Sequence, residues 1–274
     1  MESNLDFSSP IIMGILNVTP DSFSDGGAYP STKSAVDRAL IMIEQGAKII
    51  DIGGESTKPG SERVAPIEQK RRIIDVISQL KKVIPNNILI SVDTTSSEVA
   101  KAAIDLGVEM INDVSGGTDD EKMMPLIAQN NLYYCIMHMQ GSPKTMQDNP
   151  TYENVIEEIK SFLIAQAIKL TELGLEKNKI ILDPGIGFGK TTNHNLEILN
   201  NLEIFSSLGF NTLLGASRKR LFSEISKENN PEDRISGTCA TSALGVVAGI
   251  NIFRVHDVWQ NKQAIDVAFN IKKA

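Results

Sequence analysis

Cysteine is scarce in this chain, because its 274 residues include only Cys135 and Cys239. So few thiols argue against a disulfide-stabilised scaffold and favour a reducing compartment, so we expect a cytoplasmic protein. Long apolar runs are also missing. The longest, residues 243–253, has 11 residues, whereas a bilayer crossing needs about 20. The N-terminal segment has acidic residues and no apolar stretch typical of a secretory signal, so we expect no membrane segment and no signal peptide.

Positive charge is in the minority. The chain has 27 Lys and Arg against 34 Asp and Glu, a formal net charge of −7, and its longest basic run is residues 218–220. A surface that follows nucleic-acid phosphates needs clustered positive charge, so we expect no nucleic-acid partner. With 41% hydrophobic and 22% charged residues, the chain can bury a sizeable core of its own.

Short runs rich in Ile, Val and Leu alternate regularly with longer amphipathic stretches. The runs are expected to be strands at residues 11–16, 48–52, 88–92, 109–111, 132–137, 179–182, 211–214 and 251–255. The stretches are expected to be helices at residues 34–45, 67–83, 97–106, 119–129, 152–173, 196–206, 235–248 and 262–272. Glycines that can end a helix precede the next strand at five places, namely Gly46, Gly107, Gly174, Gly209 and Gly249.

Eight such units of about 34 residues each favour a closed (β/α)8 TIM barrel, with residues 1–274 as one domain. An open doubly wound sheet is the alternative. Barrel enzymes carry their chemistry on the loops that follow the strands. The polar residues at those places are Asn17, Asp51, Asp93, Asn112, His138, Asp183, Ser217 and His256. Helix capping and turn formation would explain about half of such residues without any function.

Two segments look like known motifs but lack the residues that those motifs need at the required spacing. Residues 183–192 end like a phosphate-binding P-loop, but Pro184 stands where that loop needs its first glycine. Cys135 and His138 have the spacing of two zinc ligands, but no second pair accompanies them, so core packing is the expected role of Cys135. Met137, at the end of the same run, suits either a pocket wall or a gap in the core.

Two groups of charged residues remain. Alternation along the last strand points Arg254 and His256 to the same side, where their donors suit a phosphate or diphosphate, although a surface pair of Arg254 with Asp257 is equally compatible. In a closed barrel, Asp51, Asp93 and Asp183 would meet at one mouth, and a ligand with several N–H donors or a cation would relieve their repulsion. Together the groups indicate a substrate with a heterocycle at one end and a phosphate at the other.

Seven segments, in this order and spacing, closely resemble the dihydropteroate synthase family over nearly the whole chain. They are residues 13–27 (MGILNVTPDSFSDGG), 51–57 (DIGGEST), 91–94 (SVDT), 111–113 (IND), 183–185 (DPG), 217–219 (SRK) and 254–257 (RVHD). The resemblance implies condensation of 6-hydroxymethyl-7,8-dihydropterin diphosphate with 4-aminobenzoate, which forms 7,8-dihydropteroate and releases pyrophosphate.

The resemblance also implies roles for individual residues. Asp93, Lys219 and Arg254 would be the catalytic residues. The pterin would be held by Asp93, Asn112, Met137, Asp183 and Lys219, and the diphosphate by Thr57, Arg254 and His256. Phe23, Pro59, Phe188 and Lys219 would wall the aminobenzoate pocket, and Asn17 would bind Mg²⁺. Members are commonly homodimers, and the loops at residues 18–29 and 56–64 would be lids.

Two residues depart from the commonest family pattern. Lys58 stands where Arg is usual and lacks its bidentate fork, and Arg220 stands where Ser is frequent. Two rival functions share the pterin floor: a pterin-binding methyltransferase of the same barrel type, and a catalytically silent pterin-binding module. The methyltransferase needs no diphosphate clamp, so the segments at residues 217–219 and 254–256 count against it.

Overall fold

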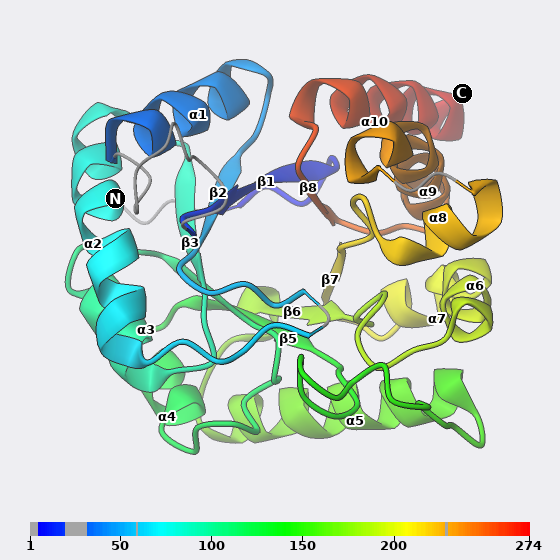
Figure 1. Cartoon of the computed structure of the whole chain (residues 1–274), viewed down its shortest axis with the longest axis horizontal. Coiled ribbons are helices and arrows are strands. Elements are labelled where there is room, and N and C mark those ends of the chain that lie inside the picture. The colour runs from blue at the N-terminus through cyan, green and yellow to red at the C-terminus, as the bar shows by residue number, and fades with distance from the viewer. Residues whose placement is uncertain (1–4, 20–31, 59, 228–229) are drawn as a thin grey trace.

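The structure is a computed structural model that describes residues 5–19, 32–58, 60–227 and 230–274. Eight parallel strands follow one another around a closed barrel, and β8 pairs with β1 to complete the ring (Figure 1). The strands are β1 (Ile11–Asn17), β2 (Ile49–Gly53), β3 (Leu89–Asp93), β4 (Met110–Asp113), β5 (Tyr133–Met137), β6 (Ile180–Asp183), β7 (Asn211–Leu214) and β8 (Ile252–Val255). This closure confirms the barrel prediction and excludes the open sheet.

Helices surround the barrel on its outside (Figure 1). They are α1 (Thr32–Glu44), α2 (Pro66–Val83), α3 (Ser97–Ile104), α4 (Met123–Gln129), α5 (Val155–Glu172), α6 (Thr192–Asn200), α7 (Leu202–Ser206), α8 (Arg220–Ser226), α9 (Ile235–Val247) and α10 (Val258–Lys273). None of the helices that the structure describes is long and apolar enough to span a membrane.

Four helical regions differ from the expectations, and in one of them α10 begins at Val258, four residues before the expected start. The helix expected at residues 196–206 is two helices, separated at Asn201, whose φ of −122° and ψ of 25° interrupt the helical backbone. Helix α4 begins only at Met123, because Asp120 accepts hydrogen bonds from the backbone N–H groups of Ser97 and Lys122 and so forms a turn. Helix α8 was not expected from the sequence.

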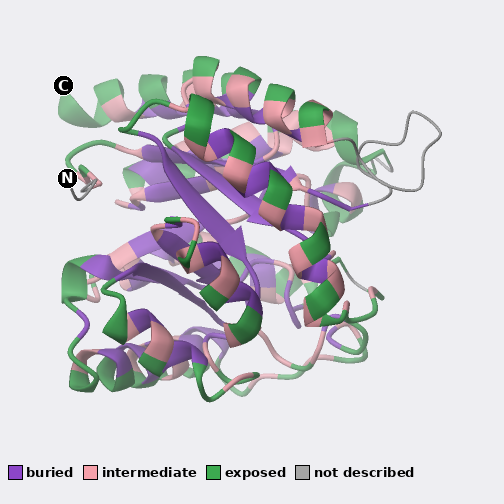
Figure 2. Cartoon of the chain, turned by 90° about the vertical axis from the view of Figure 1, so that its left-hand side faces the viewer, coloured by how far each residue is buried: buried purple, intermediate pink, exposed green. Residues whose placement is uncertain are grey.

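Alternation along the strands gives the barrel an apolar interior. The inward side chains fill it as one cluster, made of Ile11, Met13, Ile49, Leu89, Met110, Tyr133, Cys135, Ile181, Leu213 and Ile252. Leu5 and Phe7 pack against this cluster from the segment before β1. The outward side chains form a larger core with the buried faces of the helices, whose outer faces are exposed (Figure 2).

Polar side chains replace apolar ones where the same alternation reaches the carboxyl ends of the strands. Asp51 follows Ile49 by two residues on β2, Asn112 follows Met110 on β4, and Asp183 follows Ile181 on β6. Each therefore points into the barrel above the apolar cluster. Burial of charged groups is costly unless they are paired, so this polar layer is a candidate functional site.

Candidate active site

Strand register lines up the predicted residues at the mouth of the barrel. Asn17 of β1 pairs with Gly53 of β2, which pairs with Asp93 of β3, which in turn pairs with Asn112 of β4. On the opposite arc, Met137 of β5 pairs with Asp183 of β6. Residues far apart in the sequence thus form one ring, as the barrel prediction required.

Three side chains of this ring form an acceptor floor, defined here as Asp93, Asn112 and Asp183. All are buried, with 4–6% of their surface exposed. Asp183 accepts a hydrogen bond from the backbone N–H of Gly185 at 2.7 Å. Burial raises the pKa of Asp183 to about 6, although that hydrogen bond and the charge of Lys219 oppose the rise. Burial raises the pKa of Asp93 as well, against the attraction of Arg254.

Arg254 lies inside the ring and bridges two carboxylates. Its Nε donates to Oδ2 of Asp51 at 2.6 Å, and a terminal nitrogen donates to Oδ2 of Asp93 at 2.7 Å. Burial would lower the pKa of Arg254, but the two carboxylates raise it above its ordinary value. The alternative pair of Arg254 with Asp257 is wrong, because Asp257 instead binds the guanidinium of Arg218 at 2.8 and 2.5 Å.

Lys219 lies beside the floor after β7. Its ammonium is 3.9 Å from the ring centre of Phe188, and its side chain passes over Gly187, where an added Cβ would be 3.1 Å from its Cδ. Burial lowers the pKa of Lys219 to about 8, helped by the charge of Arg254 and opposed by Asp183 and Asp93. Lys219 is therefore a cation at neutral pH with an aromatic ring on one side and acceptors within electrostatic reach.

His256 is held as a neutral hydrogen-bond donor. Its backbone N–H donates to Oγ of Ser217 at 3.1 Å, and its Nδ1 lies 2.9 Å from the same oxygen. The hydroxyl hydrogen of Ser217 can then go to Nδ1, which leaves the ring hydrogen on Nε2. Burial and the charge of Arg254 lower the pKa of His256 to about 3, so it stays neutral.

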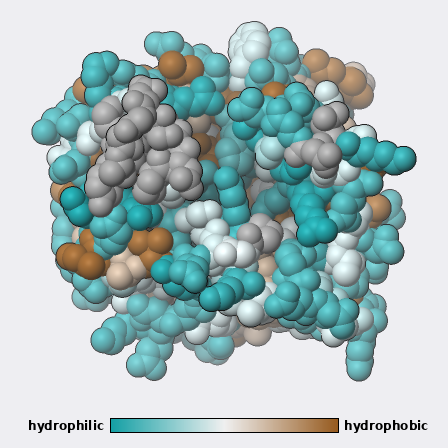
Figure 3. Space-filling model, in the orientation of Figure 1, coloured by the Kyte–Doolittle hydropathy of each residue, from teal (hydrophilic) through white to brown (hydrophobic). Residues whose placement is uncertain are grey.

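A cavity of about 950 Å³ opens at this end of the barrel. Figure 3 shows mainly hydrophilic side chains around the central hollow on this side of the molecule. The lining includes six residues to which the resemblance assigns a role, namely Asn17, Thr57, Phe188, Lys219, Arg254 and His256. The floor residues are not part of this lining, but Arg254, which lines the cavity, is bonded to Asp93 of the floor. Phe23, Pro59 and most of the expected lid at residues 18–29 fall outside the described residues.

One buried group was missed by the sequence reasoning. Lys190 is 2% exposed, and its ammonium lies within hydrogen-bond distance of three acceptors: the backbone oxygens of Phe188 and His138, at 2.9 and 3.2 Å, and Nδ1 of His138, at 3.1 Å. It thereby ties the loop after β6 to the loop after β5. A lysine inside the glycine-rich run at residues 185–190 was the available signal, and it was considered only as part of a P-loop.

The metal prediction concerns Asn17. Among the described residues there is no group of three or more His, Cys, Asp or Glu side chains that could hold a metal ion. Mg²⁺, however, usually takes only one or two protein ligands and completes its shell with water and substrate phosphates. The amide oxygen of Asn17, a hard donor on the cavity lining, fits such a site.

The chain matches a family model described as pterin binding enzyme over residues 13–256. Dihydropteroate synthase of Synechocystis sp. is 42% identical over 257 residues, which cover 94% of this chain and 88% of the relative. The chain belongs to the dihydropteroate synthase family. It is therefore an enzyme of this type, which confirms the resemblance drawn from the motifs.

Two solved structures extend the dihydropteroate synthase family match to three dimensions. Xanthomonas albilineans dihydropteroate synthase with 4-aminobenzoic acid has a TM-score of 0.92 and 37% identity, covering 98% of this chain and 96% of that one. The enzyme from the same organism in complex with 7,8-dihydropteroate has a TM-score of 0.88 and 35% identity, with the same coverage of both chains. The roles of individual residues in this chain stay predictions.

Proposed function

We propose that this chain condenses 6-hydroxymethyl-7,8-dihydropterin diphosphate with 4-aminobenzoate to form 7,8-dihydropteroate and pyrophosphate. The observation that carries the proposal is the arrangement of one site: three buried acceptors form a floor, Arg254 is paired with Asp93 of that floor, and Lys219 is within electrostatic reach of Asp183 and Asp93. An acceptor floor suits a ring edge with several N–H donors, and cations suit a diphosphate. Both halves of the substrate inferred from the sequence thus have matching groups.

The hydrogen bonds within the floor leave oxygen atoms that can accept from the pterin. Asp93 gives one oxygen to Arg254, Asp183 gives one to Gly185, and Asn112 uses its amide nitrogen on Asp51. A second carboxylate oxygen on each aspartate, and the amide oxygen of Asn112, can accept from the pterin N–H edge. Met137 packs with Phe188, Val114 and Met146 in an apolar cluster that can cover a ring face.

The diphosphate would lie nearer the mouth. Thr57, His256 and Arg254 all line the cavity, and together they offer a hydroxyl, a neutral imidazole N–H and a guanidinium. The 4-aminobenzoate would lie along the Phe188 ring and the Lys219 stem, which already contact each other. The resemblance assigns Phe23 and Pro59 to the 4-aminobenzoate as well, and both lie outside the described residues.

The chemistry follows from these groups. The bond between the pterin methylene carbon and the diphosphate oxygen breaks, and pyrophosphate leaves with the electron pair while Arg254 and His256 stabilise its charge. The electron-rich pterin carries the resulting cation, and the carboxylate of Asp93 offsets it. The nitrogen of 4-aminobenzoate then attacks the methylene carbon and loses a proton. Water is kept from the cation because the floor is buried.

Mg²⁺ is proposed as the cofactor, with Asn17 as its protein ligand. When bound, it would neutralise charge on the diphosphate and so make it a better leaving group. The amide oxygen of Asn17 holds no formal charge, so affinity for the ion would come mainly from the substrate. We therefore expect Mg²⁺ to bind with the pterin diphosphate and only weakly before it.

A pyrophosphate-release assay tests the proposal, with and without Mg²⁺ and with 4-aminobenzoate omitted. We expect release that needs both, and at least about a hundredfold loss in D93A and R254A, because each removes one partner of a buried ion pair. R71A is the matched control, because Arg71 is 65% exposed on α2. No release from the pterin diphosphate would reject the synthase and leave a methyltransferase or a silent module.

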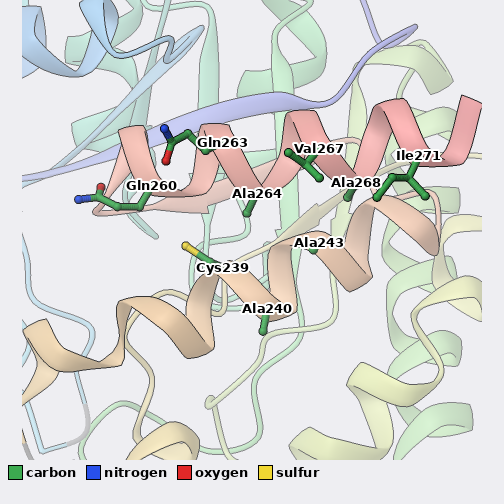
Figure 4. A pocket seen from close by; sticks show the side chains of 9 residues that line it. All are labelled: Cys239, Ala240, Ala243, Gln260, Gln263, Ala264, Val267, Ala268 and Ile271. Atoms are coloured by element: carbon green, nitrogen blue, oxygen red, sulfur yellow. The ribbon is translucent and has the colours of Figure 1, made fainter.

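We further propose a homodimer through α9 and α10. A groove of about 550 Å³ runs between these helices, lined by Cys239, Ala243, Val267 and Ile271 among others (Figure 4). Leu244, Val247, Val267 and Ile271 expose 59–69% of their surfaces along the same two helices. Such a row of exposed apolar residues supports an interface.

Oligomeric state is measured by light scattering after size exclusion. We expect V267E to shift the protein to monomer and I168E, at an exposed apolar residue on α5, to leave a dimer. A monomeric wild type would reject this interface.

A cytoplasmic location is proposed from the cysteines alone, since both Cys135 and Cys239 are free.

A further inference from the structure

Asp51 is a buried carboxylate beside the acceptor floor. It is 0% exposed, whereas the three floor residues each keep 4–6% of their surface exposed. Asp51 pairs with Ser91 in the strand register, and its Oδ2 accepts a hydrogen bond from Asn112 in the same polar layer. A ligand on the floor would not reach Asp51, because no surface of Asp51 is exposed. Asp51 therefore acts on a ligand only through its neighbours.

Two of those neighbours donate to one oxygen of Asp51. Nδ2 of Asn112 is 3.0 Å and Nε of Arg254 is 2.6 Å from Oδ2. The other oxygen, Oδ1, has no hydrogen-bond partner among the described residues. An ionised carboxylate can only accept hydrogen bonds, so Asn112 can face it only with its amide nitrogen. The amide oxygen of Asn112 is thereby turned to the opposite side.

We propose that Asp51 sets the hydrogen-bond polarity of the pterin floor, by fixing the amide of Asn112 with its oxygen toward the ligand and by holding Arg254 against Asp93. The proposal rests on the proposed function, because it concerns recognition of the pterin ring at the same site. With Asn112 fixed, the floor consists of acceptors only. Were the amide free to rotate, it could offer N–H groups instead and accept a different ring.

The chemical consequence is selectivity between two related rings. A pterin has an amino group at C2, whereas a lumazine has a carbonyl oxygen there. That oxygen would face the acceptors of the floor and find no donor. A floor with fixed polarity therefore rejects the lumazine, and a floor with a rotating amide rejects it less. Asp51 is thus a positioning residue whose effect is read in the ratio of two affinities.

The experiment compares the dissociation constants of 6-hydroxymethylpterin and 6-hydroxymethyllumazine by fluorescence titration. D51V removes the acceptor, and D51N removes the charge but keeps a carbonyl oxygen that can accept from Asn112 and Arg254. S91A is the matched control, because Ser91 is equally buried in the same layer and its Oγ has no partner among the described residues. N112A and the double variant D51V/N112A test whether Asp51 acts through Asn112.

We expect D51V to lower the preference for pterin by about tenfold or more. D51N and S91A should keep the preference within about threefold of wild type, and D51V should add nothing in the N112A background. The proposal is overturned if D51N loses the preference as completely as D51V, because charge and not acceptor geometry would then matter. It is also overturned if D51V keeps the preference.

If the valine variant does not fold, D51A, which also removes the acceptor, takes its place with the same expectations. A wild-type protein that binds neither ring would reject the proposed function together with this inference. If the wild type binds pterin and releases pyrophosphate, but the variants do not change the preference for pterin over lumazine as expected above, the inference alone is rejected.

Discussion

Replacement of Gly185 by Ala is predicted to damage the site through backbone movement. Gly185 has φ of +72°, and a Cβ added there would be 2.0 Å from the carbonyl oxygen of His138. Ordinary contact begins near 3.4 Å, so the loop after β6 or the loop after β5 must move by about 1.4 Å. Because the N–H of Gly185 also positions Asp183, this movement displaces the floor.

The size of the effect follows from two costs. Positive φ costs a non-glycine residue about 1–2 kcal/mol, and overpacking adds about 1–3 kcal/mol. A misplacement of about 1 Å in an active site can lower activity about a hundredfold. We therefore expect G185A to lose about 2–5 kcal/mol in urea unfolding and about a hundredfold in kcat/KM.

G174A is the matched control for this prediction. Gly174 has φ of +93° but no atom within 4 Å of the added Cβ, so this variant has the backbone cost without the collision. It should lose about 1–2 kcal/mol of stability and keep kcat/KM. If the two variants agree within about threefold in kcat/KM, the steric reasoning is wrong.

Three further predictions concern titratable and buried groups. The pH profile of kcat/KM for the pterin diphosphate should fall below about pH 7, where Asp93 gains a proton, and further below about pH 6, where Asp183 does, and it should also fall above about pH 8, where Lys219 loses its charge. Binding of the pterin alone should show the same acid limb, and a flat profile would contradict the assigned roles. Burial lowers the pKa of Lys190 to about 7, so the unfolded chain holds this proton more tightly than the folded one and stability rises with pH. Wild type should gain on the order of 2 kcal/mol over K190M between pH 7 and 9 in urea unfolding, and a constant difference would refute the burial of a charged amine. Y134F should lose about 1–2 kcal/mol of unfolding free energy and keep its kcat/KM, because the Tyr134 hydroxyl donates to buried Asp113 at 2.6 Å. An unchanged melting temperature would count against this prediction.

Sequence periodicity predicted the barrel well because each strand is buried on both faces. Runs such as that at residues 88–92 stand out from the amphipathic helices around them, and the structure shifts that strand by only one residue, to Leu89–Asp93. Polar residues end several strands, so periodicity alone stops the strand one residue early. Helix α8 escaped prediction because it has only seven residues, Arg220–Ser226, which is too short for a helical period to repeat.

The site was predictable in its membership but not in its contacts. Spacing and resemblance identified Asp93, Asn112 and Arg254, yet nothing in the chain order reveals that Arg254 reaches across to β2 and β3. That contact depends on barrel closure, which brings residues about 160 and 200 positions apart together. Lys190 was missed for the same reason, since its acceptors lie in another loop as well as its own.

Cys135 offers a native reporter of how often the barrel opens. Cys135 belongs to the apolar cluster inside the barrel and is 0% exposed, its neighbours in register are Asn112 and Ile181, and burial raises the pKa of its thiol. Alkylation can proceed only during moments when the strands part. Half-buried Cys239 lines the groove of the proposed dimer face, so in the monomeric V267E variant it reacts from the folded state and supplies an internal clock. The ratio of the two labelling rates, followed by mass spectrometry, would measure breathing of the enzyme interior and its suppression by a bound pterin, without introducing any foreign probe.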